Sequence, residues 1–175
     1  MQRITTPLTK SVRTQLKSGE EVLLSGTIYT ARDVAHKRMA NLMQKGKKPP
    51  IDLKNAVIYY TGPTPIRGDG LFGSCGPTTS SRMDNFTPGL LKMGLGGMIG
   101  KGKRNDEVRS SIERYKAVYF LAVGGAGAYL SKRIVSSEAV AFKELGPEAI
   151  YRLEISDFPL VVGIDSRGND IYRRG

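Results

Sequence analysis

Short apolar runs recur along this chain and predict buried β-strands. They are EVLLSGTIY at 21–29, AVIYYT at 56–61 and AVYFLAV within 117–123, of which the last is the clearest. Each run is rich in β-branched or aromatic residues and is too short for a typical helix. Strands are also expected around 139–142, 150–155 and 160–164, and a turn at 166–169 precedes a last short strand at 170–172.

Helical periodicity separates several of these strands. Ala35, Met39, Leu42 and Met43 form an apolar stripe on one helix that starts near residue 31, and Gly46 ends it. Thr87 and Pro88 suggest an N-cap and first helical residue, and Asn105 suggests a second N-cap. Shorter helices are therefore expected at 9–16, 77–86, 88–93, 106–115 and from 128 to 133.

The alternation of strands and helices predicts a layered α/β fold. The strand-rich C-terminal third argues against a fully parallel, doubly wound sheet, so we expect mixed sheets. No internal repeat or linker interrupts the chain, and a single domain over residues 1–175 is expected.

A formal net charge of +11 is the most distinctive bulk property, and it favours acidic partners such as nucleic acid, an acidic subunit or small polyanions. On charge alone, a solvated basic surface is the favoured interpretation. Aromatic residues make up only 7%, and none is interleaved with a basic run for base stacking, so nucleic-acid binding has no positive support. One cysteine, no apolar leader and no long apolar run lead us to expect a cytoplasmic protein without membrane contact.

The segment FGSCGPTTSSRMD at 72–84 has the composition of an anion site. Gly76 and Pro77 set a turn, and hydroxyl side chains follow where a helix is expected to begin. Free backbone N–H groups, hydroxyls and the positive end of the helix dipole would then meet at one place. Arg82 lies one helical turn after Thr78, so both can face one ligand. An ordinary helix capped by serine and threonine remains the alternative.

Two further segments carry candidate chemistry. Arg32 and Asp33 sit where the strand of 21–29 gives way to a helix, a favoured place for ligand contacts in α/β folds. Asp33 suits the helix N-terminus, and the lone His36 fits a structural role better than a metal ligand or a base. In MIGKGKR at 98–104, the glycines beside Lys101 would allow close approach of a ligand, whereas the following cations, Lys103 and Arg104, read as solvated surface.

Two nucleotide-binding patterns are considered and set aside. The G-x-x-x-x-G-K-[ST] pattern of a P-loop does not occur. GGAGAYL at 124–130 resembles part of a dinucleotide fingerprint, but Leu130 occupies the place of its third glycine. A glycine-rich turn from strand to helix explains this segment better.

The segments together, in this order, resemble the β subunit or C-terminal domain of class I fumarases and L-tartrate dehydratases. The matching stretches are SGTIYTARDVAHKRM, YYTGP, GPTTSSRMD, MIGKGKR, LGPEAIYRLEISDFP and GIDSRGNDIY. This resemblance implies a swivelling β/β/α domain and an oxygen-sensitive [4Fe–4S] cluster held by three cysteines, with one open iron acting as the Lewis acid. The chain has one cysteine, Cys75, so a partner α subunit is expected to hold the cluster, in a heterodimer or an α2β2 assembly.

The resemblance also assigns roles to single residues. It implies that Arg32, Thr78, Thr79, Arg82 and Lys101 bind a small dicarboxylate, and that Thr78 and Lys101 take part in catalysis. The expected reaction is hydration of fumarate to L-malate, with L-tartrate dehydration as the alternative, and activity requires the α subunit. A non-catalytic module that binds anions or nucleic acid is the competing hypothesis from another class. Cys75 is expected to be a packed residue and not a ligand.

Overall fold

The computed structural model describes residues 1–63, 73–122 and 126–173. The strands are β1 (Gln2–Thr5), β2 (Glu21–Thr30), β3 (Val57–Tyr59), β4 (Gly97–Gly100), β5 (Val118–Leu121), β6 (Ile134–Ala141) and β7 (Ile150–Ile164). The α-helices are α1 (Lys10–Arg13), α2 (Asp33–Gln44), α3 (Thr87–Lys92), α4 (Asp106–Tyr115) and α5 (Gly127–Ser131), and the 3-10 helices are η1 (Ser80–Phe86), η2 (Lys143–Glu148) and η3 (Ile171–Arg173).

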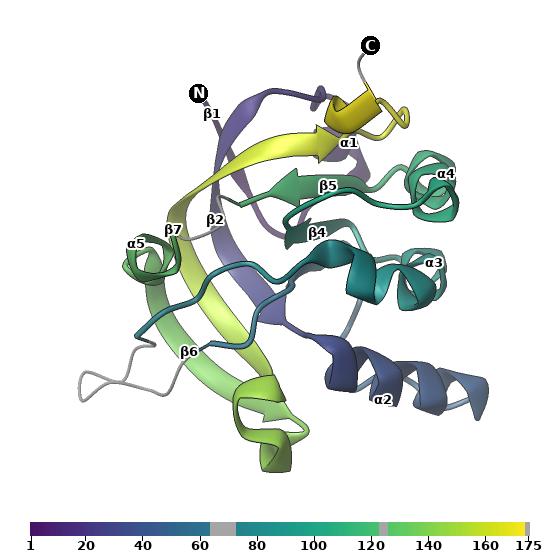
Figure 1. Ribbon diagram of the computed structural model, residues 1–175, viewed down its shortest axis with the longest axis vertical. Helices are drawn as coiled ribbons and strands as arrows, with labels where there is room; N and C mark the ends of the chain where they lie inside the picture. The colour runs from purple at the N-terminus through teal and green to yellow at the C-terminus, as the bar shows by residue number, and fades with distance from the viewer. Residues whose placement is uncertain (64–72, 123–125, 174–175) are drawn as a thin grey trace.

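The described strands form one mixed sheet, in which β1 to β5 run parallel to one another. Strand β7 is antiparallel to β2, β5 and β6, and its pairing with both β2 and β5 closes β2, β3, β4, β5 and β7 into a ring. The long strands β6 and β7 curve together along one side of the molecule (Figure 1). The layered α/β class with a mixed sheet is therefore confirmed.

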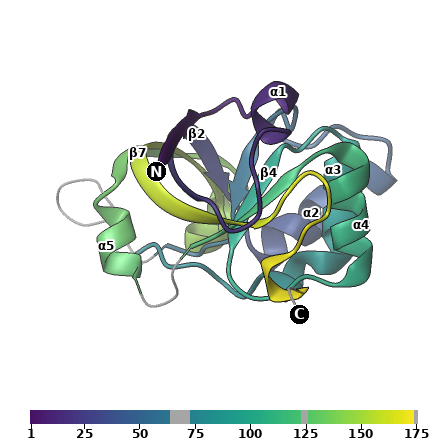
Figure 2. The same ribbon diagram turned by 90° about the horizontal axis from the view of Figure 1, so that it is seen from above.

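Helices α2, α3 and α4 lie together on one side of the sheet, and α5 lies on the opposite side (Figures 1 and 2). Side chains alternate along the ring strands, as the two-residue period of a strand requires. Tyr59 and Phe120 belong to the core cluster inside the ring, whereas Ile58 and Tyr119 pack in a second cluster towards the helices. Strands that are buried on both faces have continuous apolar sequences, which is why such strands were clearly predicted from the sequence.

The C-terminal third differs from expectation in three ways. The strands predicted at 150–155 and 160–164 are one strand, β7, which bends at Asp157 (φ 49) without breaking. The Asp157 N–H donates to Ser25 Oγ of β2 at 2.9 Å, so the neighbouring strand supports the bend. The strand predicted at 139–142 begins at Ile134. Of the residues predicted as a last strand, Asp170 forms an isolated bridge with Ile164, and the other two belong to η3.

One strand and one helix start also differ from the sequence-based prediction. Strand β1 was not predicted, because its four residues show little apolar pattern and only Ile4 is buried. Thr87 is the first residue of α3 and not its N-cap, and its hydroxyl donates to the Met83 carbonyl at 2.8 Å. Asn105 does cap α4, since its Oδ1 accepts the Val108 N–H at 2.9 Å.

Gly26 marks a crowded bend of β2 and supports a prediction about stability. Its φ is +110°, and a Cβ there would lie 2.3 Å from Thr6 Oγ1. We expect Gly26→Ala to lower the free energy of unfolding by about 3 kcal/mol, from left-handed strain and overpacking together. Gly46→Ala is the matched control, because Gly46 has φ +73° but open space around it. Equal losses for the two variants in urea unfolding would contradict this account.

Candidate anion-binding site

Three candidate segments meet at the carboxyl edge of the parallel strands. Arg32 follows β2 and Lys101 follows β4, and both strands are neighbours of β3. Backbone hydrogen bonds continue the sheet past this edge: the Thr78 N–H donates to the Tyr60 carbonyl at 2.7 Å, and the Ser80 N–H donates to the Lys101 carbonyl at 3.0 Å. The sequence-predicted residues of the 76–84 segment therefore lie beside the ends of β3 and β4.

Two N–H groups of this segment, those of Thr78 and Ser80, are not free, which corrects the sequence-based expectation. The helix is a 3-10 helix that begins only at Ser80, and the amides of Thr78 and Ser80 are both used by carbonyls. Thr79 forms an isolated parallel bridge with Lys101. Thr79 and Lys101 are exposed and Thr78 is half-buried. Hydroxyls and cationic side chains, and not a helix dipole, are thus the groups available to an anion.

Both candidate arginines are paired with a carboxylate of the chain. Arg82 Nη2 donates to Asp33 Oδ2, which joins η1 to the first residue of α2, and the Arg82 side chain is 51% exposed. Arg32 Nε lies 3.7 Å from Glu148 Oε1 in a partly exposed pair. No hydrogen bond or ion pair of the Lys101 amine is found in the described parts of the chain. The three cations are therefore accessible, and their geometry already suits carboxylate ligands.

Buried polar atoms without a hydrogen-bond partner gather at the start of α2. Among the described side chains they include Arg32 Nε, Asp33 Oδ1 and His36 Nε2, which lie within about one helical turn. An unmet buried polar group costs about 1–3 kcal/mol. Three such atoms at one helix start show that the described groups of the chain leave the hydrogen bonding there incomplete.

His36 is the most deeply buried of these three residues. Its Nδ1 lies 2.8 Å from the Arg32 carbonyl oxygen, which only accepts, so Nδ1 carries the proton and Nε2 is a bare acceptor. The ring is 1% exposed and packs edge-on against Tyr60. Burial lowers the pKa of His36 to about 4, so the imidazole is neutral near pH 7. The structural role suggested by the sequence fits this environment.

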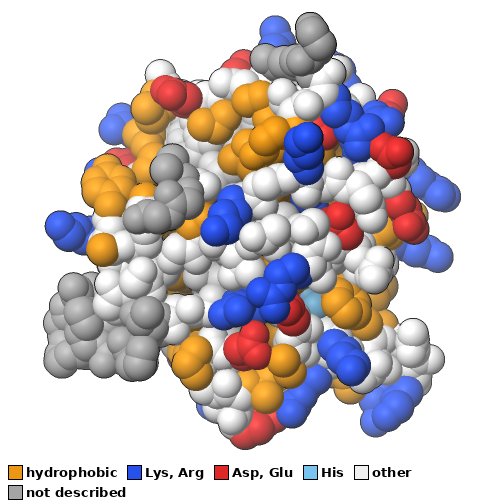
Figure 3. Space-filling model, viewed as in Figure 1, with side chains coloured by type: hydrophobic (Ala, Val, Ile, Leu, Met, Phe, Trp, Pro, Cys, Tyr) orange, Lys and Arg blue, Asp and Glu red, His pale blue; other side chains and the backbone are white. Residues whose placement is uncertain are grey.

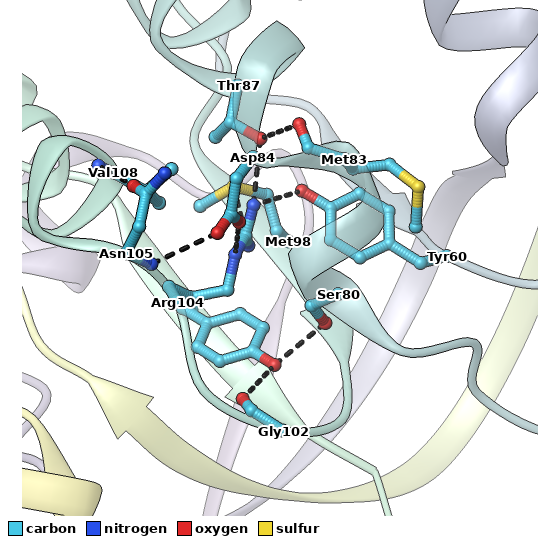
Figure 4. Close-up of polar contacts among 11 residues, drawn as sticks. Tyr60, Ser80, Met83, Asp84, Thr87, Met98, Gly102, Arg104, Asn105 and Val108 are labelled. Atoms are coloured by element: carbon cyan, nitrogen blue, oxygen red, sulfur yellow. Dashed lines mark hydrogen bonds and ion pairs between the residues drawn. The ribbon is translucent and has the colours of Figure 1, made fainter.

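Arg104 is the clearest residue that sequence reasoning missed. It was assigned to solvated surface with Lys103, and Lys103 is indeed exposed, but Arg104 is only 3% exposed. Its Nε donates to Asp84 Oδ1 at 2.6 Å (Figure 4). The guanidinium also lies over the rings of Tyr60 and Tyr119. No local pattern distinguishes two adjacent cations in MIGKGKR, because the buried partners come from distant parts of the chain.

The remaining sequence candidates have packing explanations. Cys75 is fully buried, its N–H donates to the Gly127 carbonyl at 3.1 Å, and burial raises the pKa of its thiol to about 12. The turn predicted at 124–127 lies largely outside the described ranges, which resume at residue 126, and the five-residue helix α5 follows it. A search of the described residues finds no group of three or more His, Cys, Asp or Glu side chains placed to hold a metal ion.

Basic side chains on the face in Figure 3 are interspersed with acidic and uncharged ones. That face carries no continuous basic track of the kind that nucleic-acid binding uses. Within the described ranges, no helix has both the length and the apolarity needed to cross a membrane.

The fold and the site together define a layered α/β domain that gathers cations and hydroxyls at a sheet edge. The chain belongs to the family described as Fumarase C-terminus, which matches residues 2–175. A Methanocaldococcus jannaschii protein is 39% identical over 94% of this chain and 88% of its own length, and it is provisionally named as an L(+)-tartrate dehydratase subunit beta. Fumarate hydratase 2 of Leishmania major and the anaerobic class I fumarate hydratase of Escherichia coli are 36% and 38% identical, over 93% and 86% of this chain. The chain spans only 30% and 28% of those two relatives.

The buried imidazole predicts a specific dependence of stability on pH. The pKa of His36 is about 4 in the folded chain and about 6.5 when unfolded, so the imidazole is neutral in both states well above pH 6.5. Between pH 6.5 and 4 the imidazole binds a proton in the unfolded state but stays neutral in the folded state, so lower pH favours unfolding. We expect stability to fall between pH 6.5 and 4 by an order of 3 kcal/mol.

His36→Phe is the control, because it keeps a ring in the pocket and cannot titrate. Urea unfolding at several pH values should show a smaller loss for the variant over this window. His36 is the single histidine, so no other imidazole contributes to the difference. Parallel pH profiles of the two proteins would contradict the assignment.

Proposed function

We propose that this chain is the β subunit of a two-chain, iron–sulfur-dependent hydro-lyase that reversibly hydrates fumarate to L-malate in the cytoplasm. The observation that carries the proposal is the meeting of Arg32, Thr78, Arg82 and Lys101, from three separate segments, at one edge of the sheet. Membership of the Fumarase C-terminus family supports it. We treat residues 1–175 as one domain with this role.

The site residues suit a substrate with two carboxylates. Removing a proton next to a carboxylate builds negative charge on that carboxylate, and preorganised cations stabilise such charge. Arg32 and Arg82 supply planar forks that bind carboxylates in a bidentate manner, and Lys101 supplies a further positive charge. Thr79 adds a hydroxyl that contacts the substrate.

Thr78 is proposed to take part in proton transfer. A threonine hydroxyl is a weak base, so an acid–base group of the partner is expected beside it. His36 is poorly placed for this task, because its ring is almost fully buried.

The cluster is placed on the partner subunit, because the residues of this chain do not fit a cluster site. A [4Fe–4S] cluster is held by thiolates, and this chain has one cysteine, whose buried thiol has a raised pKa. The chain's own part is therefore to bind and orient the dicarboxylate and to support proton transfer. Alone, it is expected to show little or no hydratase activity.

Reconstitution tests the proposal directly. We expect anaerobic co-expression of this chain with a cluster-bearing α chain to give fumarate hydration well above that of α alone. No gain over the α chain would contradict the proposed function. The relative from Methanocaldococcus jannaschii favours L-tartrate as the second candidate substrate, and kinetics on both substrates with the same preparation would decide between them.

Substitution at the sheet edge tests the individual roles. We expect Arg82→Ala or Lys101→Ala to lower turnover by about 100-fold or more, the usual effect of removing one charge-stabilising group. Assembly should be unchanged, because both side chains are exposed and the Arg82–Asp33 pair contributes at most about 1 kcal/mol. Lys103→Ala, at a neighbouring exposed cation, is the matched control. Wild-type turnover in either variant would remove that residue from the site.

A non-catalytic module makes the opposite prediction. It would bind DNA or RNA with a steep dependence on salt, and Arg82→Ala would leave that binding unchanged. Such a result, together with inactive reconstitution, would favour this alternative over the enzyme.

A further inference from the structure

Two residues that we propose to bind the substrate, Lys101 and Arg82, lie on segments that are separated in sequence but joined by one buried ion pair. Lys101 follows β4, and Arg104 comes three residues later. Arg82 lies in η1, and Asp84 comes two residues later. The pair between Arg104 and Asp84, with side chains 0% and 8% exposed, therefore links the segment of one ligand to the segment of the other.

The ion pair is extended by further bonds to both segments (Figure 4). Asp84 Oδ2 accepts the Asn105 N–H at 3.0 Å, directly after Arg104. Arg104 Nη2 donates to Thr87 Oγ1 at 2.8 Å and to the Tyr60 hydroxyl at 3.3 Å. Each carboxylate oxygen of Asp84 thus has a partner, and the guanidinium is held on several sides in one orientation.

A second connection runs through Tyr119. Its hydroxyl lies 2.7 Å from Ser80 Oγ and 2.8 Å from the Gly102 carbonyl oxygen. Because the carbonyl only accepts, Tyr119 donates to Gly102, and the serine hydroxyl donates to Tyr119. Ser80 lies at the start of η1 and Gly102 directly follows Lys101, so this bridge joins the same two segments.

Close packing tightens the connection. A Cβ at Gly100, the residue before Lys101, would lie 1.9 Å from Ser80 Oγ. The absence of a side chain at Gly100 therefore makes room for η1 and not for a ligand, which revises the role expected from the sequence. The ligand side chains are exposed, whereas the contacts that hold their backbones are buried.

Net stability is a poor explanation for such a network. Buried ion pairs gain little over well-packed apolar residues of similar volume, because both charges lose their hydration. A fixed arrangement of hydrogen bonds between two loops is what an apolar contact would not supply. The location of the network, directly behind two exposed ligand-bearing segments, points to geometry as its contribution.

We propose that Arg104 is a positioning residue, which fixes Lys101 relative to Arg82 through Asp84, Thr87 and Tyr60. This inference rests on the proposed function, because it assigns Arg104 a role in orienting the ligands of the same dicarboxylate. Arg104 does not itself touch the substrate, since its guanidinium is enclosed by protein.

Arg104→Met tests the proposal in the reconstituted complex, with Lys103→Met as the matched control. Displacing a binding group by about 1 Å costs on the order of 100-fold in rate. We expect kcat/KM for fumarate to fall by about that factor, with KM raised at least tenfold on the same order-of-magnitude argument. KM does not depend on how much enzyme is folded, so it separates positioning from loss of protein. A wild-type KM in Arg104→Met, with only less folded complex, would overturn the proposal.

Arg104→Lys guards against a variant that fails to assemble. Lysine keeps the charge but lacks the planar fork, so we expect it to restore folding while KM stays raised. If Arg104→Lys has the wild-type KM, charge alone suffices and the positioning role of the guanidinium is wrong.

Amide hydrogen exchange of the full chain makes the test independent of activity. The Ser80 N–H, which donates to the Lys101 carbonyl, should exchange at least about tenfold faster in Arg104→Met than in Lys103→Met, a factor that corresponds to local opening easier by about 1.4 kcal/mol. Unchanged protection would overturn the proposal. If the reconstituted complex shows no gain in fumarate hydration over the α chain while Ser80 exchange responds as expected, the proposed function fails but the connection between the segments stands.

Discussion

The pairing of β7 with both β2 and β5 is the constraint on which the rest of this structure depends. It closes five strands into a ring, so the inner faces of all five bury one core while β3, β4 and β5 pack their outer faces against α2, α3 and α4. Because β2, β3 and β4 are held parallel inside this ring, their carboxyl ends lie at one edge. Segments that leave these ends are brought together, whatever their separation in sequence.

The sequence predicted the parts of this arrangement that depend on local chemistry. The runs of β3 and β5 are apolar on both faces, the run of β2 alternates buried and partly exposed residues, the stripe of α2 has helical spacing, and Asn105 caps α4 through its own side chain. The same local signals placed Arg32 at a strand end. What sequence reasoning missed depends on contacts between distant residues. Asp157 bends β7 instead of ending it because Ser25 of β2 accepts its N–H, and Arg104 is buried because Asp84 and Tyr60 lie around it.

The network behind the site also explains why the expected helix dipole is absent there. Ser80 donates its N–H to Lys101 and lies beside Tyr119, which fixes the segment against β4 before it can begin a regular α-helix. The Thr78 and Ser80 amides, which an anion could have used, are engaged by carbonyls in this attachment. Recognition is left to side chains, and arginine is well suited to it because its fork matches a carboxylate without help from the backbone.

Burial separates the two kinds of arginine at this edge. Arg82 and Arg104 each pair with an aspartate, but the first pair is partly exposed and the second is enclosed. A solvent-exposed pair contributes little free energy, so a substrate carboxylate can replace or join Asp33 at low cost. An enclosed pair is costly to break, because separation leaves an uncompensated charge out of water. Under the proposed function, the exposed Arg82–Asp33 pair is therefore the one that can exchange its aspartate for a substrate carboxylate, whereas the enclosed Arg104–Asp84 pair holds the two segments together.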